Sequence, residues 1–167
     1  MGLFNFLFKP STNKNICTDK NSEYYEYPEN FKKSLELDDK YDKVLNMHFK
    51  LLEKIKMNYT VVMNLGDEFS PQMESVIEDC KRDISIAKEV YNYYMEKAKL
   101  DNQPLEDYIP NYESFKRLAI IYEKRKEYQK ALDVCQKSID IGFYKDGTDG
   151  QIPGRMARLY KKLNKIG

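Results

Sequence analysis

Apolar side chains recur every three or four residues along two long stretches of this chain, residues 38–66 and 70–98. This spacing places side chains on one face of an α-helix, whereas a strand requires strict alternation. In the first stretch the apolar face comprises Tyr41, Val44, Leu45, His48, Leu52, Ile55, Tyr59 and Val62. In the second it comprises Met73, Val76 or Ile77, Cys80, Ile84, Ala87, Tyr91, Tyr94 or Met95, and Ala98. No segment alternates convincingly, so the sequence predicts an all-α fold.

Residues that favour helix ends mark the boundaries of these two helices. Asp38 or Asp39 can cap the first helix, because a short carboxylate accepts hydrogen bonds from the free amides of the first turn, and Gly66 can end it. Ser70 followed by Pro71 opens the second, because proline in the first turn gives up an amide that has no partner there. The connecting loop has only about five residues, which predicts an antiparallel helix hairpin.

Two prolines, Pro104 and Pro110, interrupt the helical pattern. Three further helices are predicted beyond them, at about 111–125, 127–141 and 152–165. The segment Asp146-Gly147-Thr148-Asp149-Gly150 between the last two lacks the regular acidic spacing and the distal glutamate of a calcium loop. We expect turns there, followed by a helix cap with Pro153 in the first turn.

The overall charge gives no reason to expect a polyanionic partner. Lys and Arg number 28 against 27 Asp and Glu, for a formal net charge of +1. The three cysteines, Cys17, Cys80 and Cys135, are an odd number, lie far apart and form no CxxC pair, which argues against a disulfide framework and a zinc site. We therefore expect a reducing cytoplasm and no cofactor, and the bias towards Lys, Asn, Ile and Tyr favours a bacterial source.

The first 35 residues differ from the rest, so we divide the chain into residues 1–35 and a single helical domain, 36–167. Residues 2–8 are apolar but too few to span a bilayer, which takes roughly 20 residues. Three hypotheses stay open for this tip: contact with a membrane surface, docking on a protein, or packing on the core. A polar linker and an aromatic arm around Pro28 follow, and we expect residues 1–35 to be partly disordered.

The stretch Leu118-Ala119-Ile120-Ile121-Tyr122-Glu123-Lys124-Arg125-Lys126-Glu127-Tyr128-Gln129-Lys130-Ala131-Leu132 carries the most specific pattern in the chain. Together with Phe115 and Ile139 it resembles a tetratricopeptide repeat, a unit of two interlocking helices, placed at residues 112–145. Ala119 and Ala131 occupy positions where the two backbones approach closely. The departures are Cys135 for a large ring, Ser138 for alanine and Phe143 for the usual closing proline.

One repeat cannot bury both of its faces. The resemblance therefore implies that the hairpin of residues 39–100 acts as a degenerate neighbouring unit and that the helix at 152–165 caps the array. The expected architecture is a short right-handed α-solenoid of antiparallel helix hairpins. Self-association that completes the array stays open.

Such repeats bind a partner protein along the first helix of each pair, so the resemblance implies a non-enzymatic adaptor or regulatory protein. The outward-facing positions of that helix are Glu113, Lys116, Ile120, Glu123 and Lys124. Lys116 stands where chaperone-binding members carry a clamp lysine, but Ile120 replaces their asparagine. The resemblance therefore implies a peptide or helix partner other than a chaperone tail.

A second hypothesis concerns the basic terminal helix. Its cations are Arg155, Arg158, Lys161, Lys162 and Lys165. Several cations on one helix attract phosphates, so this patch suggests a nucleic-acid-associated accessory protein. The simpler explanation is a solvated capping face, with cations near a helix C-terminus where the helix dipole favours them.

Two single residues are candidates for special roles. His48 is the only histidine and lies on the apolar face of the first helix, so we expect it to be partly buried and bonded to a backbone or hydroxyl group. Tyr93 lies off the apolar face and is an interface candidate. The sequence contains no glycine-rich phosphate loop, GxSxG or HExxH motif, and we predict no catalytic or metal-binding residue.

Overall fold

The computed structural model describes residues 28–165, and all regular secondary structure in this range is helical, which confirms the all-α class. The helices are α1 (Glu29–Leu65), α2 (Pro71–Ser85), α3 (Ala87–Leu100), α4 (Leu105–Tyr108), α5 (Glu113–Lys124), α6 (Tyr128–Ile141) and α7 (Gln151–Leu163). The predicted apolar tip, the polar linker and most of the aromatic arm lie outside the described residues.

Helix α1 begins about ten residues before the predicted start. Pro28 precedes its first turn, and the Phe31 amide donates to the Pro28 carbonyl at 2.9 Å. Asp38 and Asp39 are therefore interior residues, and the predicted caps are wrong; Asp38 instead accepts a hydrogen bond from the Tyr93 hydroxyl of α3 at 2.9 Å. Helix α3 packs against α1. The expected boundary between residues 35 and 36 falls inside α1, which is a continuous helix.

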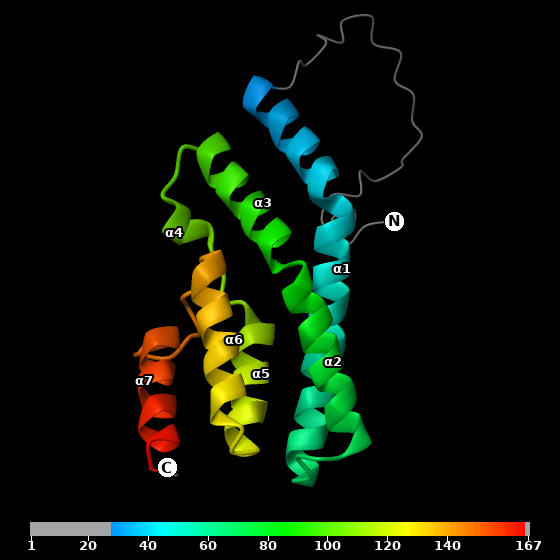
Figure 1. The fold of residues 1–167 in the computed structure, drawn as a ribbon. Coiled ribbons are helices and arrows are strands. Elements are labelled where there is room, and N and C mark those ends of the chain that lie inside the picture. Colours follow the sequence, from blue (N-terminus) through cyan, green and yellow to red (C-terminus); the bar gives the residue numbers. More distant parts are fainter. Residues whose placement is uncertain (1–27, 166–167) are drawn as a thin grey trace, which may run out of the picture.

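The turn between α1 and α2 forms as the sequence predicts. Gly66 ends α1 in the left-handed conformation, with φ of 71°. Ser70 caps α2, because its hydroxyl oxygen accepts a hydrogen bond from the Met73 amide at 3.2 Å, and Pro71 occupies the first turn. Helix α1 packs against both α2 and α3 (Figure 1).

The predicted second long helix is divided at Ile86 into α2 and α3. Ile86 has φ of −101° and ψ of 2°, and its amide donates to the carbonyls of Asp83 and Ile84. The Asp83 carbonyl also accepts a hydrogen bond from the Tyr112 hydroxyl at 2.9 Å. The Tyr112 side chain, which is distant in the sequence, thus donates a hydrogen bond to the backbone at the break. The local spacing of apolar residues does not reveal this bond.

Helices α5 and α6 form the second hairpin, and the small residues of the predicted repeat lie in it. Ala119 and Ala131 are fully buried, which allows the two helices to approach closely. Phe143, at the closing position of the predicted repeat, is also fully buried, and its ring centroid lies 4.6 Å from that of Tyr112 and 5.5 Å from that of Tyr91.

The helices pack largely in chain order. Helix α2 contacts α5, α5 contacts α6, and α6 contacts α7, so the pairs follow one another across the molecule (Figure 1). Arg125 at the end of α5 links the hairpins, because its guanidinium donates to the Glu68 carbonyl at 2.7 Å and lies 2.7 Å from the Glu74 carboxylate.

Candidate functional site

The five residues of the predicted groove lie along α5. Glu113, Lys116 and Ile120 are half-buried at the N-terminal end of this surface. Glu113 lies 3.8 Å from the Lys116 ammonium and 3.3 Å from the Arg117 guanidinium. These pairs are partly solvent-exposed, so each contributes little to stability and can exchange partners.

The other end of the surface is tied to neighbouring elements. Glu123 lies 2.8 Å from Lys162 and 3.6 Å from Arg155, both on α7. Lys124 lies 3.7 Å from Glu68 in the loop between α1 and α2. Glu123 and Lys124 are therefore tied to neighbouring elements, whereas the ion pairs of Glu113 and Lys116 form within α5.

Tyr59 of α1 contacts α5 through Arg117. The Arg117 guanidinium lies over the Tyr59 ring, 4.7 Å from its centroid. Burial raises the pKa of Tyr59, although the nearby Arg117 opposes that shift. The contact between Arg117 and Tyr59 was not predicted from the sequence. Arg117 lies at the edge of the apolar face of α5, and Tyr59 lies on a helix that is distant in the chain.

The basic terminal helix does not present all five predicted cations. Arg155 is only 4% exposed, and its Nε and Nη2 atoms donate to Asp146 Oδ2 at 3.1 and 2.9 Å. Its assignment to an exposed patch is wrong, because the buried Asp146 carboxylate holds it inside the protein. Lys162 is exposed but paired with Glu123, while Arg158, Lys161 and Lys165 are exposed.

The loop before α7 is organised around the same Asp146. Asp146 Oδ1 accepts hydrogen bonds from the amide and the hydroxyl of Thr148, at 3.0 and 2.6 Å. Burial by itself raises the pKa of Asp146, but the hydrogen bonds from Thr148 and Arg155 outweigh it and lower the pKa. The turns are as expected, and Gly150 occupies the N-cap position of α7, where no side chain caps the helix. Residues 28–165 contain no cluster of three His, Cys, Asp or Glu side chains suited to a metal ion.

His48 lies in a buried polar cluster with a different partner from the one expected. Its Nδ1 is hydrogen-bonded to Asp83 Oδ1 at 2.7 Å, and Ser114 donates to Asp83 Oδ2 at 2.6 Å. The expected backbone or hydroxyl partner is thus replaced by a carboxylate. The His48 ring also packs against the Tyr112 ring, tilted by 31° with 4.7 Å between centroids.

The cluster holds the residue types of a serine nucleophile system but not its geometry. Both Ser114 and His48 point to Asp83, whereas a nucleophilic serine hydrogen-bonds the imidazole. All three side chains are at most 4% exposed. The arrangement joins α1, α2 and α5, and it offers no reacting group to a substrate.

Tyr93 is not an exposed interface residue as predicted. It is 8% exposed, its hydroxyl donates to Asp38, and its ring packs edge-on against Tyr41. The packing of α3 on α1 covers Tyr93, and a contact between helices cannot be predicted from the spacing along one helix.

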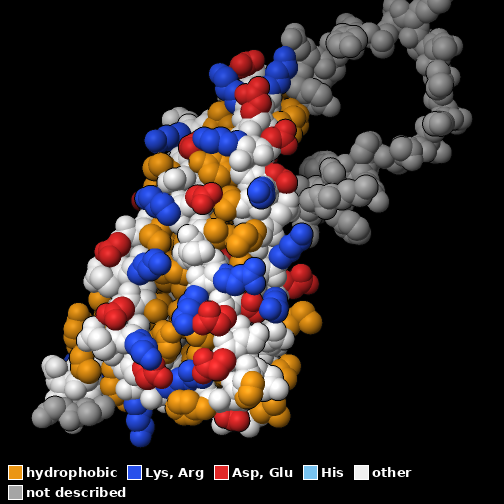
Figure 2. Space-filling view, turned by 45° about the vertical axis from the view of Figure 1, so that its right-hand side comes forward, with side chains coloured by type: hydrophobic (Ala, Val, Ile, Leu, Met, Phe, Trp, Pro, Cys, Tyr) orange, Lys and Arg blue, Asp and Glu red, His pale blue; other side chains and the backbone are white. Residues whose placement is uncertain are grey.

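Two of the hollows on the surface of residues 28–165 lie near these elements, and neither is lined by the five predicted groove residues. One, of about 270 Å³, has Phe115, Leu118 and Tyr122 of α5 at its centre, between α2 and α6. The other, of about 510 Å³, lies between α1 and α2. Figure 2 shows charges of both signs with apolar side chains between them on the face turned to the viewer.

Comparisons with family models, with curated proteins and with solved structures give no match for this chain. In the part of the chain that the structure describes, no helix is both long enough and apolar enough to cross a bilayer.

Proposed function

We propose that this chain is a non-enzymatic protein-interaction module of the tetratricopeptide kind, which binds a peptide or helix of a partner protein along α5. In this proposal α1 with α2 and α3 forms a degenerate first unit, α5 and α6 form the recognisable repeat, and α7 caps the array.

The observation that carries the proposal is the packing of the helices in chain order, from α2 to α5 to α6 to α7. In repeat arrays each unit buries its apolar face mainly against its neighbours, and the resulting extended face serves for binding. The burial of Ala119 and Ala131, on two helices that contact each other, supports the proposed repeat.

The chemistry of the α5 surface suits a peptide with mixed contacts. Ile120 supplies an apolar contact, and Lys116 and Glu113 supply one charge of each sign beside it. A partner carboxylate can replace Glu113 at Lys116 with little loss, because the existing pair is partly solvated and 3.8 Å long. The nucleic-acid alternative is weaker, since Arg155 is buried and Lys162 is paired.

The first prediction tests this surface by affinity capture and mass spectrometry. We expect the double variant Lys116→Glu/Ile120→Asp to keep the helical circular-dichroism spectrum and to lose a protein partner that the wild type retains. Reversing the charge and burying a carboxylate should weaken binding at least about tenfold, because each change places an unpaired charge against the partner.

The matched control is Lys99→Glu, a charge reversal at an exposed position of α3. It should retain the partner. Retention of every partner by the folded double variant, or capture of nucleic acid alone, would contradict the proposal.

A further inference from the structure

A second surface runs along the side of α1, away from the α5 surface. Its residues follow one another at intervals of four, three, four, three and four: Lys43, Met47, Lys50, Lys54, Met57 and Val61. This alternation brings side chains into one nearly straight line along a helix, and it is the spacing by which one helix packs against another. We call these six residues the α1 seam.

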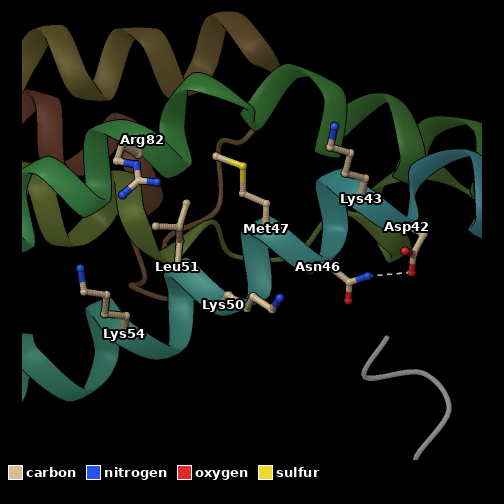
Figure 3. A pocket seen from close by; sticks show the side chains of 8 residues that line it. All are labelled: Asp42, Lys43, Asn46, Met47, Lys50, Leu51, Lys54 and Arg82. Carbon is tan, nitrogen blue, oxygen red and sulfur yellow. Dashed lines mark hydrogen bonds between the residues drawn. The ribbon is translucent and has the colours of Figure 1, made fainter. Parts of the chain in front are cut away.

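The basic half of the seam borders the larger hollow, together with Arg82 of α2 (Figure 3). Lys54 and Arg82 lie 2.7 and 4.0 Å from the buried carboxylate of Asp79. Within residues 28–165, Lys43 and Lys50 form no ion pair. Since the lining contributes only Asp42 as a further acid, four cations face two carboxylates and the hollow attracts anions.

The floor of the hollow and the other half of the seam are apolar. Met47 and Leu51 line the hollow, and Leu51 is buried beneath it. Beyond it, Met57 is 65% exposed and Val61 is 59% exposed. Large aliphatic side chains at this exposure, one helical turn apart, gain most from being covered by an apolar face.

We propose that the α1 seam binds an acidic amphipathic helix of a partner protein. Its aliphatic face covers Met47, Met57 and Val61, and its carboxylates meet Lys43 and Lys50. The seam is about 27 Å long at the helical rise per residue, which matches roughly five turns of a partner helix. This surface is separate from the α5 surface, so the two proposals stand or fall independently.

The observations disfavour two other occupants. Phosphates would pair with the lysines but would leave Met57 and Val61 uncovered, because a nucleic-acid backbone has no aliphatic face. A second copy of this chain, paired antiparallel along the whole seam, would bring Lys50 of each protomer next to Lys54 of the other, and like charges across a helix pair are destabilising.

The second prediction concerns peptides selected without bias. A phage-displayed library of random peptides of roughly 18 residues, the length of the seam, is selected on the full chain. We expect enriched peptides that combine Glu or Asp with aliphatic residues at helical spacing. By fluorescence anisotropy, the Lys43→Glu/Lys50→Glu variant should bind such a peptide at least about tenfold more weakly.

The control is Lys56→Glu/Lys99→Glu, which makes the same change in net charge at exposed positions off the seam and should bind as the wild type does. Binding should also weaken when salt is raised from about 0.05 M to about 0.5 M. Circular dichroism shows whether each variant is folded, and Met57→Asp/Val61→Asp gives a second test at the apolar half, with the same loss expected.

Three outcomes would overturn the inference. In the first, the enriched peptides carry no excess of acid or bind the seam variants as tightly as wild type. In the second, a single-stranded oligonucleotide binds as tightly as the best peptide and is lost in the same lysine variant. In the third, sedimentation shows a dimer of the wild type that the seam variants dissociate.

Discussion

The buried carboxylate of Asp83 joins three helices at one point. Each of its oxygens accepts a hydrogen bond, one from His48 of α1 and one from Ser114 of α5, and its backbone carbonyl accepts another from Tyr112. A carboxylate that is fully buried is tolerated only when its partners are present, because an unpaired charge in the interior is costly. The cluster therefore fixes how α1, α2 and α5 meet.

The third prediction is that His48→Leu destabilises the protein by about 3 kcal/mol, because it leaves Asp83 buried with one oxygen unpaired. Urea unfolding followed by circular dichroism measures the change. In the double variant His48→Leu/Asp83→Leu the loss should be smaller than the sum of the two single losses by more than about 1 kcal/mol, since the residues act as a pair. Additive losses would show that the contact contributes no coupling.

At the scale of elements, the end of α6 depends on a glycine at which any side chain would meet both backbone strain and a close neighbour. Gly142 ends the helix at φ of 117° and lies against Tyr91 of α3. A Cβ at this position would stand 2.3 Å from Tyr91 Cε2, well inside van der Waals contact. Gly66 ends α1 at φ of 71°, but a Cβ there meets nothing within 4 Å. Replacement of Gly66 therefore tests the cost of the backbone conformation alone, whereas replacement of Gly142 tests conformation and packing together.

The fourth prediction compares alanine at these two positions. Gly66→Ala should cost about 1 kcal/mol, the penalty of a left-handed conformation for a residue with a Cβ. Gly142→Ala should cost at least about 2 kcal/mol, because it adds displacement of the Tyr91 ring to the conformational cost. Thermal unfolding of both variants checks this, and equal losses would mean that Tyr91 moves aside freely.

At the scale of the whole molecule, burial suppresses the ionisation of groups on several helices. Burial raises the pKa of Cys80 from 9.0 to about 12 and that of Cys135 to about 11. It also raises the pKa of Tyr93 and Tyr112, in which a nearby Asp adds to the effect. Each of these groups holds its proton in the folded protein at a pH where the unfolded chain has released it.

The fifth prediction is that the free energy of unfolding falls as the pH rises above 9. The folded thiols keep their protons up to pH values near 11 and 12, whereas unfolded thiols lose them near pH 9, so alkaline pH favours the unfolded state. The loss between pH 8 and pH 10 is of order 1 kcal/mol for each buried thiol. Urea unfolding at several pH values measures it.

The control for this prediction is Cys80→Ala, which removes one titrating group and should reduce the slope between pH 8 and pH 10. An unchanged slope would mean that the Cys80 thiol ionises equally in both states.

The features that could be predicted from the sequence are local ones. The all-α class follows from apolar spacing, and the Gly66 stop and the Ser70–Pro71 start depend only on residues within a turn of each helix end. The α5–α6 hairpin, with its two small residues, was predictable for the same reason. The five residues predicted to line a groove do lie on one helix, but their ion-pair partners were not predicted.

Other features depend on partners that are distant in the sequence and that meet only when the chain folds. Helix α1 begins at Glu29 and covers Tyr93 because α3 packs beside it, and Arg155 is buried because Asp146 and Glu123 meet it. His48 and Asp83 are 35 residues apart in the chain. A periodic pattern indicates which face of a helix is apolar, but burial of a charge or a hydroxyl depends on which partner the folded chain brings to it.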